Sequence, residues 1–255
     1  MDLHRSFTIR ESSHCIHNPF TPANLADLGQ ALSLPPGTLM LDLACGTGEM
    51  LCTWARDHQV SGTGVDISTV FMAAARARAA ELGVDGRLSF THGDASGYVA
   101  EAPVGIASCI GATWIGGGVP GTVDLLRRSL QPGGMMLIGE PYWRQEPPDQ
   151  ATADGCNAIG SDDFLPLPEL IERFGDLGCD VVEMVLASQD DCDRYAAMQW
   201  LNIRRWLDAN PDDELAVDTP GTGANTSGCL RPDEPLTNMP VNNPGSASHL
   251  GMVTK

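Results

Sequence analysis

Apolar and polar residues alternate along most of the chain in two different rhythms. Short apolar runs predict buried strands, and apolar residues spaced three or four apart predict amphipathic helices between them. The predicted strands are 39–43, 62–66, 87–95, 104–110, 135–139 and 181–187. The predicted helices are 22–32, 49–55, 69–80, 121–130, 168–177 and 190–207. Strands that alternate with helices in this way favour an α/β fold, a doubly wound and mostly parallel sheet with helices on both faces.

The stretch 39–51, LMLDLACGTGEML, carries the most informative pattern. An apolar run broken only by Asp42 is followed by small residues, among them Gly46 and Gly48, and then by helical spacing. A strand, a glycine turn and a helix form the opening unit of nucleotide-binding α/β domains. The turn lets a ligand approach the backbone, and the free N–H groups of the new helix face an anionic or polar group.

The ligand of this turn is predicted to be cationic and free of phosphate. A dinucleotide fingerprint requires a third Gly or Ala where this chain has Leu51, and Asp42 would repel a pyrophosphate. Here the chain resembles the class I S-adenosylmethionine-dependent methyltransferases, whose first motif is D/E-x-G-x-G-x-G. The matching residues are Asp42, Ala44, Gly46 and Gly48, with alanine in place of the first glycine.

Two further carboxylates follow at intervals that suit the adenosyl part of this cofactor. Asp66 ends the second predicted strand, where a carboxylate accepts hydrogen bonds from both ribose hydroxyls; the alternative is an acid that favours the following helix start. The resemblance implies that Asp94, after the third strand, accepts from the adenine amino group, whereas alone it is equally an ordinary turn residue. Their neighbours Ile67 and Ala95 are expected to line the same site.

The loop after the fourth predicted strand lies where ligands bind in open parallel sheets, beyond the carboxyl ends of the strands. Ile110 is expected to contact the cofactor. Trp114 offers a π face to a sulfonium, to adenine or to the acceptor, and packing in the core is the competing interpretation. Residues 130–134, Leu-Gln-Pro-Gly-Gly, are a second feature of the family and favour it over dehydrogenases.

The segment after the fifth predicted strand supplies candidates for catalysis and acceptor binding. Glu140 and Tyr142 are the catalytic candidates, and Trp143 adds an aromatic wall. The Pro-, Asp- and Gly-rich insertion 145–163 is longer than a connection needs and is predicted to be a substrate lid.

Residues 1–36 are predicted to form a cover over the cofactor or substrate, ending in a helix capped by Thr21. His17 and Asn18 are either contacts of this cover, with His17 a substrate contact, or residues that stabilise the turn before Pro19.

Residues 208–255 are predicted to be a disordered, atypical tail. Prolines alternate there with Gly, Asn, Ser and Thr, a composition that buries too little apolar area to offset the entropy of ordering. The last antiparallel strand that usually completes this fold is not recognisable, so the sheet is expected to lack it.

The formal net charge of −18 argues against nucleic acid or an anionic membrane surface as the main partner. No leader or membrane-spanning stretch is recognisable, which favours a cytoplasmic protein without stable membrane association. The eight cysteines have no zinc-like spacing, so no metal is expected.

The resemblance therefore implies an α/β methyltransferase domain over 37–207, nearest to relatives of the cyclopropane fatty acid synthases. It would use S-adenosylmethionine to methylate a small molecule by in-line displacement. Two alternatives stay open. One is a cofactor-binding protein of the same fold without activity, and the other is an NAD-dependent oxidoreductase.

Overall fold

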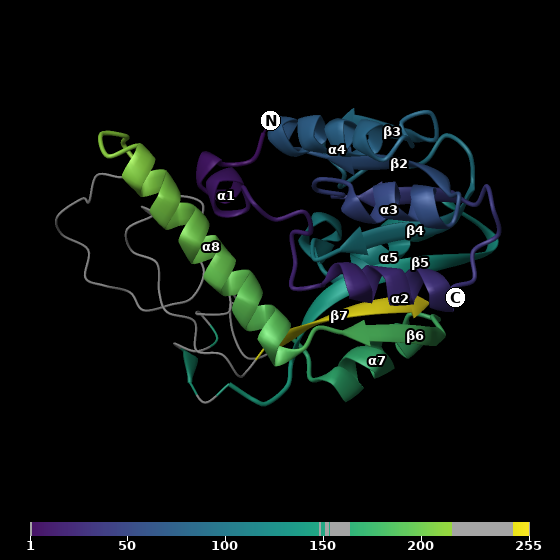
Figure 1. The fold of residues 1–255 in the computed structure, drawn as a ribbon. Helices are drawn as coiled ribbons and strands as arrows, with labels where there is room; N and C mark the ends of the chain where they lie inside the picture. The colour runs from purple at the N-terminus through teal and green to yellow at the C-terminus, as the bar shows by residue number, and fades with distance from the viewer. Residues whose placement is uncertain (1, 148, 151–152, 154–163, 216–246, 255) are drawn as a thin grey trace.

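Seven strands form one sheet in the order β3-β2-β1-β4-β5-β7-β6 (Figure 1). The structure, a computed structural model, describes residues 2–147, 149–150, 153, 164–215 and 247–254. Adjacent strands from β3 to β5 pair in parallel, and β7 pairs antiparallel with both of its neighbours. The strand order reverses between β1 and β4, which confirms the predicted doubly wound fold. The strands are β1 (Leu39–Leu43), β2 (Ser61–Asp66), β3 (Leu88–His92), β4 (Val104–Ile110), β5 (Leu130–Trp143), β6 (Val181–Leu186) and β7 (Ala247–Thr254).

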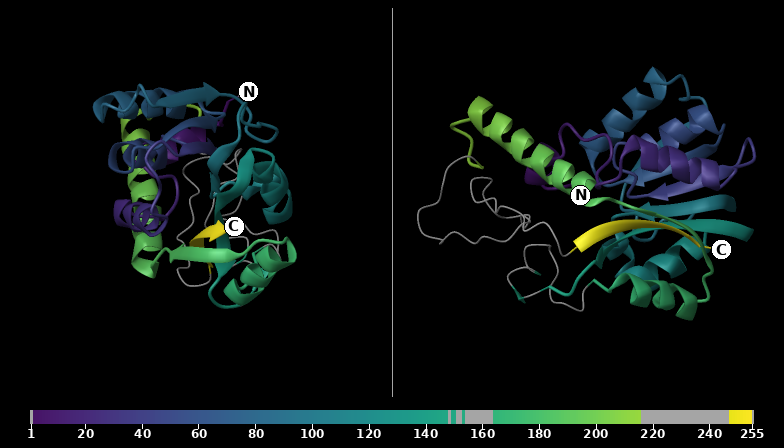
Figure 2. Two further views of the ribbon diagram at one scale, coloured as in Figure 1. Left: turned by 90° about the vertical axis from the view of Figure 1, so that its right-hand side faces the viewer. Right: turned by 60° about the horizontal axis from the view of Figure 1, so that its bottom comes forward.

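Helices cover both faces of the sheet (Figure 2). The flanking helices are α2 (Pro22–Ala31), α3 (Glu49–Asp57) and α4 (Thr69–Glu81) on one face, and α5 (Val119–Arg127) and α7 (Leu167–Asp176) on the other. Successive strand residues point to opposite faces, so Met40 packs beneath α2 and α3 while Leu41 packs toward α5. The central strands β1 and β4 are therefore buried on both sides, which is why they are mostly apolar runs.

Helix starts fall at the residues that the sequence predicts. Thr21 caps α2 in a reciprocal capping box with Asn24, and Ser68 caps α4 by accepting from the N–H of Phe71. These caps fix where the chain leaves each loop at the carboxyl edge of the sheet.

The predicted absence of the last antiparallel strand is wrong. Residues 247–254 form β7, which lies between β5 and β6 and hydrogen-bonds to both. Its sequence has no strong strand pattern, and pairing along both edges supplies what intrinsic propensity does not. Residues 216–246 of the predicted tail lie outside the described residues, as does most of the predicted lid over 145–163.

Strand β5 is longer than predicted and continues through Trp143. Its pairing with β4 ends at Gly139. From Glu140 to Tyr142 its paired neighbour is β7, and Trp143 also forms a bridge with Pro166. Pro141 is tolerated in this stretch because the strand has a single neighbour there, so one backbone N–H is dispensable. Glu140 consequently belongs to the strand instead of following it.

A second layer lies beyond the carboxyl ends of the parallel strands (Figure 1). It consists of α1 (Arg5–Arg10), which the sequence analysis did not predict, and the long helix α8 (Gln189–Ala209). Ile9 of α1 and Ile203 of α8 pack together with Trp206 and Leu207. This layer holds the N-terminal segment over the edge of the sheet where ligands bind in this fold.

Candidate functional site

The turn between β1 and α3 is built from left-handed residues. Gly46 and Gly48 have φ angles of 56° and 69°, and Ala44, at the position of the family's first glycine, has a φ of 55°. A Cβ on Gly46 would lie 2.7 Å from Nδ1 of His17, and one on Gly48 would lie 2.7 Å from the ring of Phe90. Both glycines are therefore required for conformation and for space.

The Asp66 carboxylate at the end of β2 holds this turn in place. One oxygen accepts from the N–H of Gly46 at 2.9 Å and the other from the N–H of Ser68 at 2.8 Å. The residue is only 6% exposed. Each carboxylate oxygen keeps a lone pair after these bonds, which leaves both able to accept from a ligand hydroxyl.

Asp42, at the end of β1, is a buried acid that lacks a cationic partner among the described residues. Its Oδ1 accepts from the hydroxyl of Ser108 at 2.6 Å. Burial raises the pKa of Asp42 to about 7, the Ser108 hydrogen bond opposes this rise, and the charge of Asp66 adds to it. A cation placed beside Asp42 would favour its ionised form.

A cavity of about 60 Å³ lies between this turn and the N-terminal segment. Its lining includes Asp42 and Gly46 from the turn, Ile110 of β4, and His17 and Asn18 from the N-terminal segment. The N-terminal segment lies close against the turn, since a Cβ on Gly46 would meet the His17 ring. Thr47 donates a hydrogen bond to the carbonyl of Cys15 across the same contact.

His17 is a contact of the glycine turn and not merely a turn-stabilising residue. Its ring stacks at a tilt on Phe71, with 4.1 Å between centroids, and its Nε2 is buried without a hydrogen-bond partner among the described residues. Burial lowers the pKa of His17, against the opposing charges of Glu11 and Asp66. The neutral imidazole is thus favoured beside the cavity.

The N-terminal segment is anchored to α8 through Glu11. This carboxylate is 1% exposed and accepts hydrogen bonds from the hydroxyl of Tyr195 at 2.9 Å and from Gln199 at 2.7 Å. Nδ1 of His14 lies 3.0 Å from Oε2 of Glu11, the oxygen that also accepts from Tyr195. Burial raises the pKa of Glu11, but His14 and Arg10 outweigh it and the net pKa is lowered. Glu11 therefore joins the cover to α8 as an ion.

Asp94 lies near this turn but does not line the cavity. It follows β3, whose last residue His92 pairs with Asp66, and its side chain is exposed and accepts from the N–H of Ser96. That bond lowers the pKa of Asp94. Its neighbour Ala95 is buried in the core, and the carbonyl of Ile67 lies 2.8 Å from Nε2 of His92. The structure thus brings Asp42 and Asp66 together at the turn and leaves Asp94 at its rim.

A larger cavity of about 560 Å³ lies beyond the ends of β4 and β5. Its walls include Trp114, Glu140, Phe164 and Arg173. Trp114 stands on the short 3₁₀ helix η1 (Thr113–Gly116) and is 69% exposed, so its interpretation as a core residue is wrong. Oε2 of Glu140 accepts from the hydroxyl of Thr113 at 2.6 Å, which fixes the carboxylate in the wall.

Tyr142 and Trp143 do not line either cavity. Tyr142 is 4% exposed in the core beneath α5 and α7, and Trp143 is 3% exposed against Phe164 and Ala153. Extension of β5 turns both rings into packing residues. Glu140 is therefore the one predicted catalytic residue that the structure places at a cavity wall.

Two other features bear on the class of protein. None of the helices in the described ranges is long and apolar enough to cross a membrane. Within those same ranges, no cluster of three or more His, Cys, Asp or Glu residues could hold a metal ion.

Comparison with known proteins gives consistent matches. A family model described as a methyltransferase domain matches residues 40–134. The uncharacterized protein YjhP of Escherichia coli (strain K12) is 57% identical over 218 residues, which cover 86% of this chain and 88% of that protein.

Solved structures match over nearly the whole chain. A methyltransferase from Geobacter sulfurreducens, solved with S-adenosyl-L-homocysteine, is 56% identical with a TM-score of 0.89, and the match covers 100% of this chain and 98% of that one. One from Thiobacillus denitrificans, solved with the same ligand, is 50% identical with a TM-score of 0.89 over 100% and 99%.

The match with YjhP extends far beyond the glycine turn, and the turn itself has the geometry of the family's first motif. The close relatives of known structure are described as S-adenosylmethionine-dependent methyltransferases. This chain belongs to the S-adenosylmethionine-dependent methyltransferases of class I, the family that the glycine turn indicates.

Proposed function

We propose that this chain transfers the methyl group of S-adenosylmethionine to a small molecule held in the cavity beyond β4 and β5. The observation that carries this proposal is the adjacency of two cavities. Ile110 lines the small cavity over the glycine turn, and the next residue, Gly111, lines the larger one. A group that projects from the first cavity past the end of β4 enters the second.

The residues at the turn suit the cofactor. Asp42, with no cationic partner among the described residues, matches an ammonium group, because a cation nearby would offset the cost of ionising a buried carboxyl. Asp66 retains lone pairs for the two ribose hydroxyls. Exposed Asp94, with Ile67 and Ala95 beside it, borders the place for the adenine, where its carboxylate accepts from the amino group.

The small cavity is much smaller than the cofactor, so the cover must move for it to bind. Among the described residues, the contacts of this segment near the turn are the hydrogen bond from Thr47 to Cys15, the packing of His17 on Phe71 and the packing of Ile16 on the core beneath α2 and α3. The junction at Glu11 is far more extensive. We infer that residues 15–18 open while His14, Glu11 and the layer formed by α1 and α8 stay in place.

The bound cofactor supplies an activated methyl carbon, which the acceptor's nucleophilic atom attacks as the carbon–sulfur bond breaks and S-adenosylhomocysteine leaves. Glu140 receives the proton that the acceptor loses, since its carboxylate is held in the cavity wall by Thr113. Trp114 offers its exposed ring as a surface for the acceptor.

The experiment is a turnover assay with methyl-labelled cofactor and a panel of small metabolites, read as S-adenosylhomocysteine produced. We expect turnover with at least one acceptor. For that acceptor, Glu140→Gln should lower kcat at least 100-fold, with affinity for S-adenosylhomocysteine within two-fold of wild type. Glu101→Gln is the matched control, because Glu101 is exposed at the amino end of β4, away from the cavity.

Tight cofactor binding without turnover on the panel or on a small-molecule cell extract would favour the inactive, cofactor-binding alternative. Uptake of NAD in place of S-adenosylhomocysteine would favour the oxidoreductase. If the Glu140→Gln variant methylated an acceptor as fast as the wild type, Glu140 would not be the base. The proposal of methyl transfer would still stand.

A further inference from the structure

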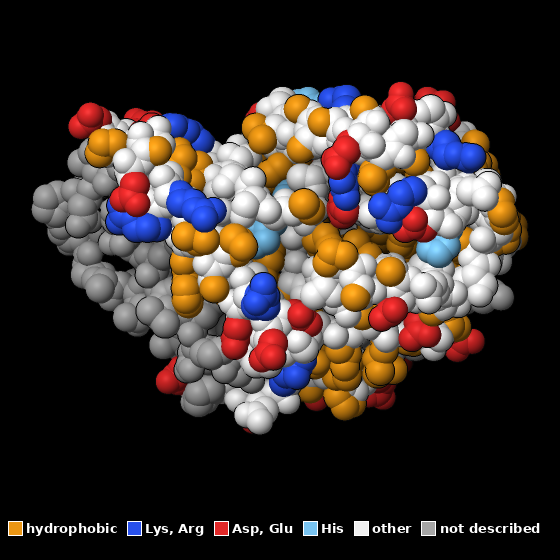
Figure 3. All heavy atoms as spheres, viewed as in Figure 1, with side chains coloured by type: hydrophobic (Ala, Val, Ile, Leu, Met, Phe, Trp, Pro, Cys, Tyr) orange, Lys and Arg blue, Asp and Glu red, His pale blue; other side chains and the backbone are white. Residues whose placement is uncertain are grey.

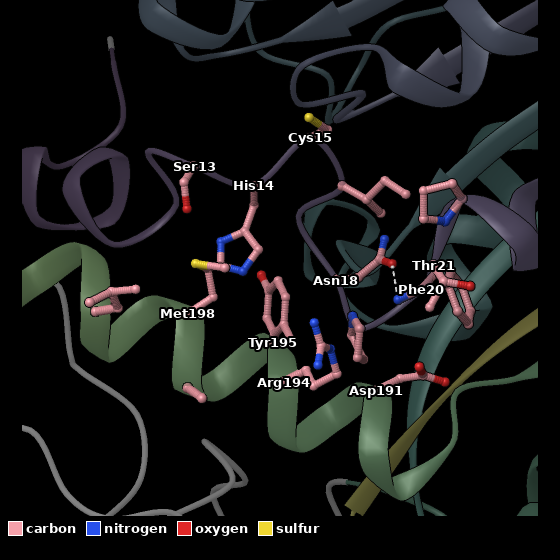
Figure 4. A pocket seen from close by; sticks show the side chains of 15 residues that line it. Ser13, His14, Cys15, Asn18, Phe20, Thr21, Asp191, Arg194, Tyr195 and Met198 are labelled. Carbon is pink, nitrogen blue, oxygen red and sulfur yellow. Dashed lines mark hydrogen bonds between the residues drawn. The ribbon is translucent and has the colours of Figure 1, made fainter.

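A groove of about 490 Å³ separates the N-terminal cover from α8 (Figure 4). One wall is residues 13–22 and the other is the stretch 191–201 of α8. It shares no lining residue with the cavity that contains Glu140, so it is a separate place on the molecule. The space-filling view shows hydrophobic side chains gathered on α8 beside the hollow that separates it from the helices over the sheet (Figure 3).

One end of the groove carries an unpaired cation. Arg194 extends from α8 toward the segment that carries Asn18 (Figure 4). Within the described ranges its guanidinium makes no hydrogen bond or ion pair. The groove's carboxylate, Asp191, is already engaged in the capping box with Ser188. A free guanidinium in a hollow can donate forked hydrogen bonds to an anionic group.

At the other end of the groove, the wall formed by α8 is apolar. Met198 and Leu201 lie one and two turns further along the same stripe of α8 and are 37% and 40% exposed. Across the groove from Met198 lie Ser13 and His14 (Figure 4), and Ile16, Pro19 and Phe20 add apolar side chains to the wall formed by the cover. Apolar side chains that are left partly open between two walls are a surface that an apolar ligand would cover.

We propose that this groove binds an amphipathic anion, with a carboxylate or phosphate head at Arg194 and an apolar body along Met198 and Leu201. The axial rise between Arg194 and Leu201 is about 10 Å, which matches a straight chain of about eight carbons. The guanidinium supplies the forked donors that such a head group accepts. The ligand binds beside the cofactor site, since Cys15 and Ile16 line both hollows.

The test is calorimetric titration of the full chain with sodium octanoate. Saturable binding is expected, with octyl phosphate as a second anionic probe. Butanoate and octan-1-ol should each bind at least 10-fold more weakly, because one lacks the apolar length and the other the charge. Arg194→Gln should weaken octanoate binding at least 10-fold. Arg205→Gln is the control, because Arg205 is also exposed on α8, makes no hydrogen bond or ion pair with another described residue and lies outside the groove.

A second pair of variants tests the apolar end. Leu201→Gln should weaken octanoate binding at least five-fold, whereas Trp200→Gln, on the same helix but outside the groove, should leave it within two-fold. Thermal melting of each variant confirms that the fold persists. The proposal is overturned if neither anionic probe binds, or if the Arg194 and Arg205 variants bind octanoate equally well.

Discussion

Asp66 accepts a hydrogen bond from the backbone N–H of Gly46 at 2.9 Å, so the end of β2 fixes the turn that follows β1. Replacement Asp66→Asn removes the charge from this bond and from the proposed contact with the ribose. Hydrogen bonds to charged groups contribute about 1.5–3 kcal/mol, so affinity for S-adenosylhomocysteine should fall about 10- to 100-fold. Calorimetry measures it. Asp85→Asn, at an exposed turn between α4 and β3, should bind like wild type.

The buried acid Asp42 should make stability depend on pH in a direction that its replacement reveals. Its folded-state pKa of about 7 exceeds the ordinary value of 3.8. The stability that the protonated carboxyl provides is therefore fully present below pH 3.8. It is lost as pH rises through 7, because the buried carboxyl must then ionise in the folded protein. The difference in pKa corresponds to about 4 kcal/mol.

Asp42→Asn should therefore gain stability over wild type as pH increases from 4 to 8, while binding S-adenosylmethionine more weakly. Denaturant unfolding at pH 4.5 and pH 8 measures the first effect. A stability difference between the two proteins that does not change with pH would show that Asp42 is not held neutral by burial.

The left-handed conformation of Ala44 predicts a stabilising substitution. A φ of 55° is strained for alanine and free of strain for glycine, so Ala44→Gly should stabilise the protein by about 1 kcal/mol. Ala74→Gly, at an exposed position inside α4, should instead destabilise it by about 1 kcal/mol. The two opposite shifts, measured by thermal melting, separate the effect of backbone conformation from the general effect of glycine.

The Glu11 junction predicts that the hydroxyl of Tyr195 contributes to the stability of the protein. Tyr195→Phe leaves a buried carboxylate short of a donor, which should cost about 1–3 kcal/mol of unfolding free energy. Tyr98→Phe should cost under about 0.5 kcal/mol, because the described structure gives the Tyr98 hydroxyl no hydrogen bond. Equal losses in the two variants, by denaturant unfolding, would mean that the bond to Glu11 is not what anchors the cover.

The parts of this fold that sequence predicts are those where local pattern and tertiary environment agree. The run over Leu39–Leu43 is apolar because that strand is buried on both faces, and Thr21 marks a helix start because its hydroxyl caps it. The glycine turn is equally predictable from the sequence, since a positive φ and a close approach both require glycine.

The missed features depend on contacts between distant parts of the chain. β7 is a strand because β5 and β6 pair with it, and no pattern in residues 247–254 reveals those partners. The burial of Tyr142 follows from the extension of β5 along β7. The groove with Arg194 exists because α8 packs against a segment almost two hundred positions earlier, and α1 is too short for its periodicity to stand out.

A crystal structure of this chain with S-adenosylhomocysteine tests the central claim most directly. The account predicts the amino group within hydrogen-bonding reach of the Asp42 site, directly or through one water, and both ribose hydroxyls on the Asp66 carboxylate. It also predicts that residues 15–18 are displaced from the turn and that the sulfur faces the cavity of Glu140. A ligand bound at the turn with its ribose away from Asp66, or with its sulfur facing away from that cavity, would contradict it.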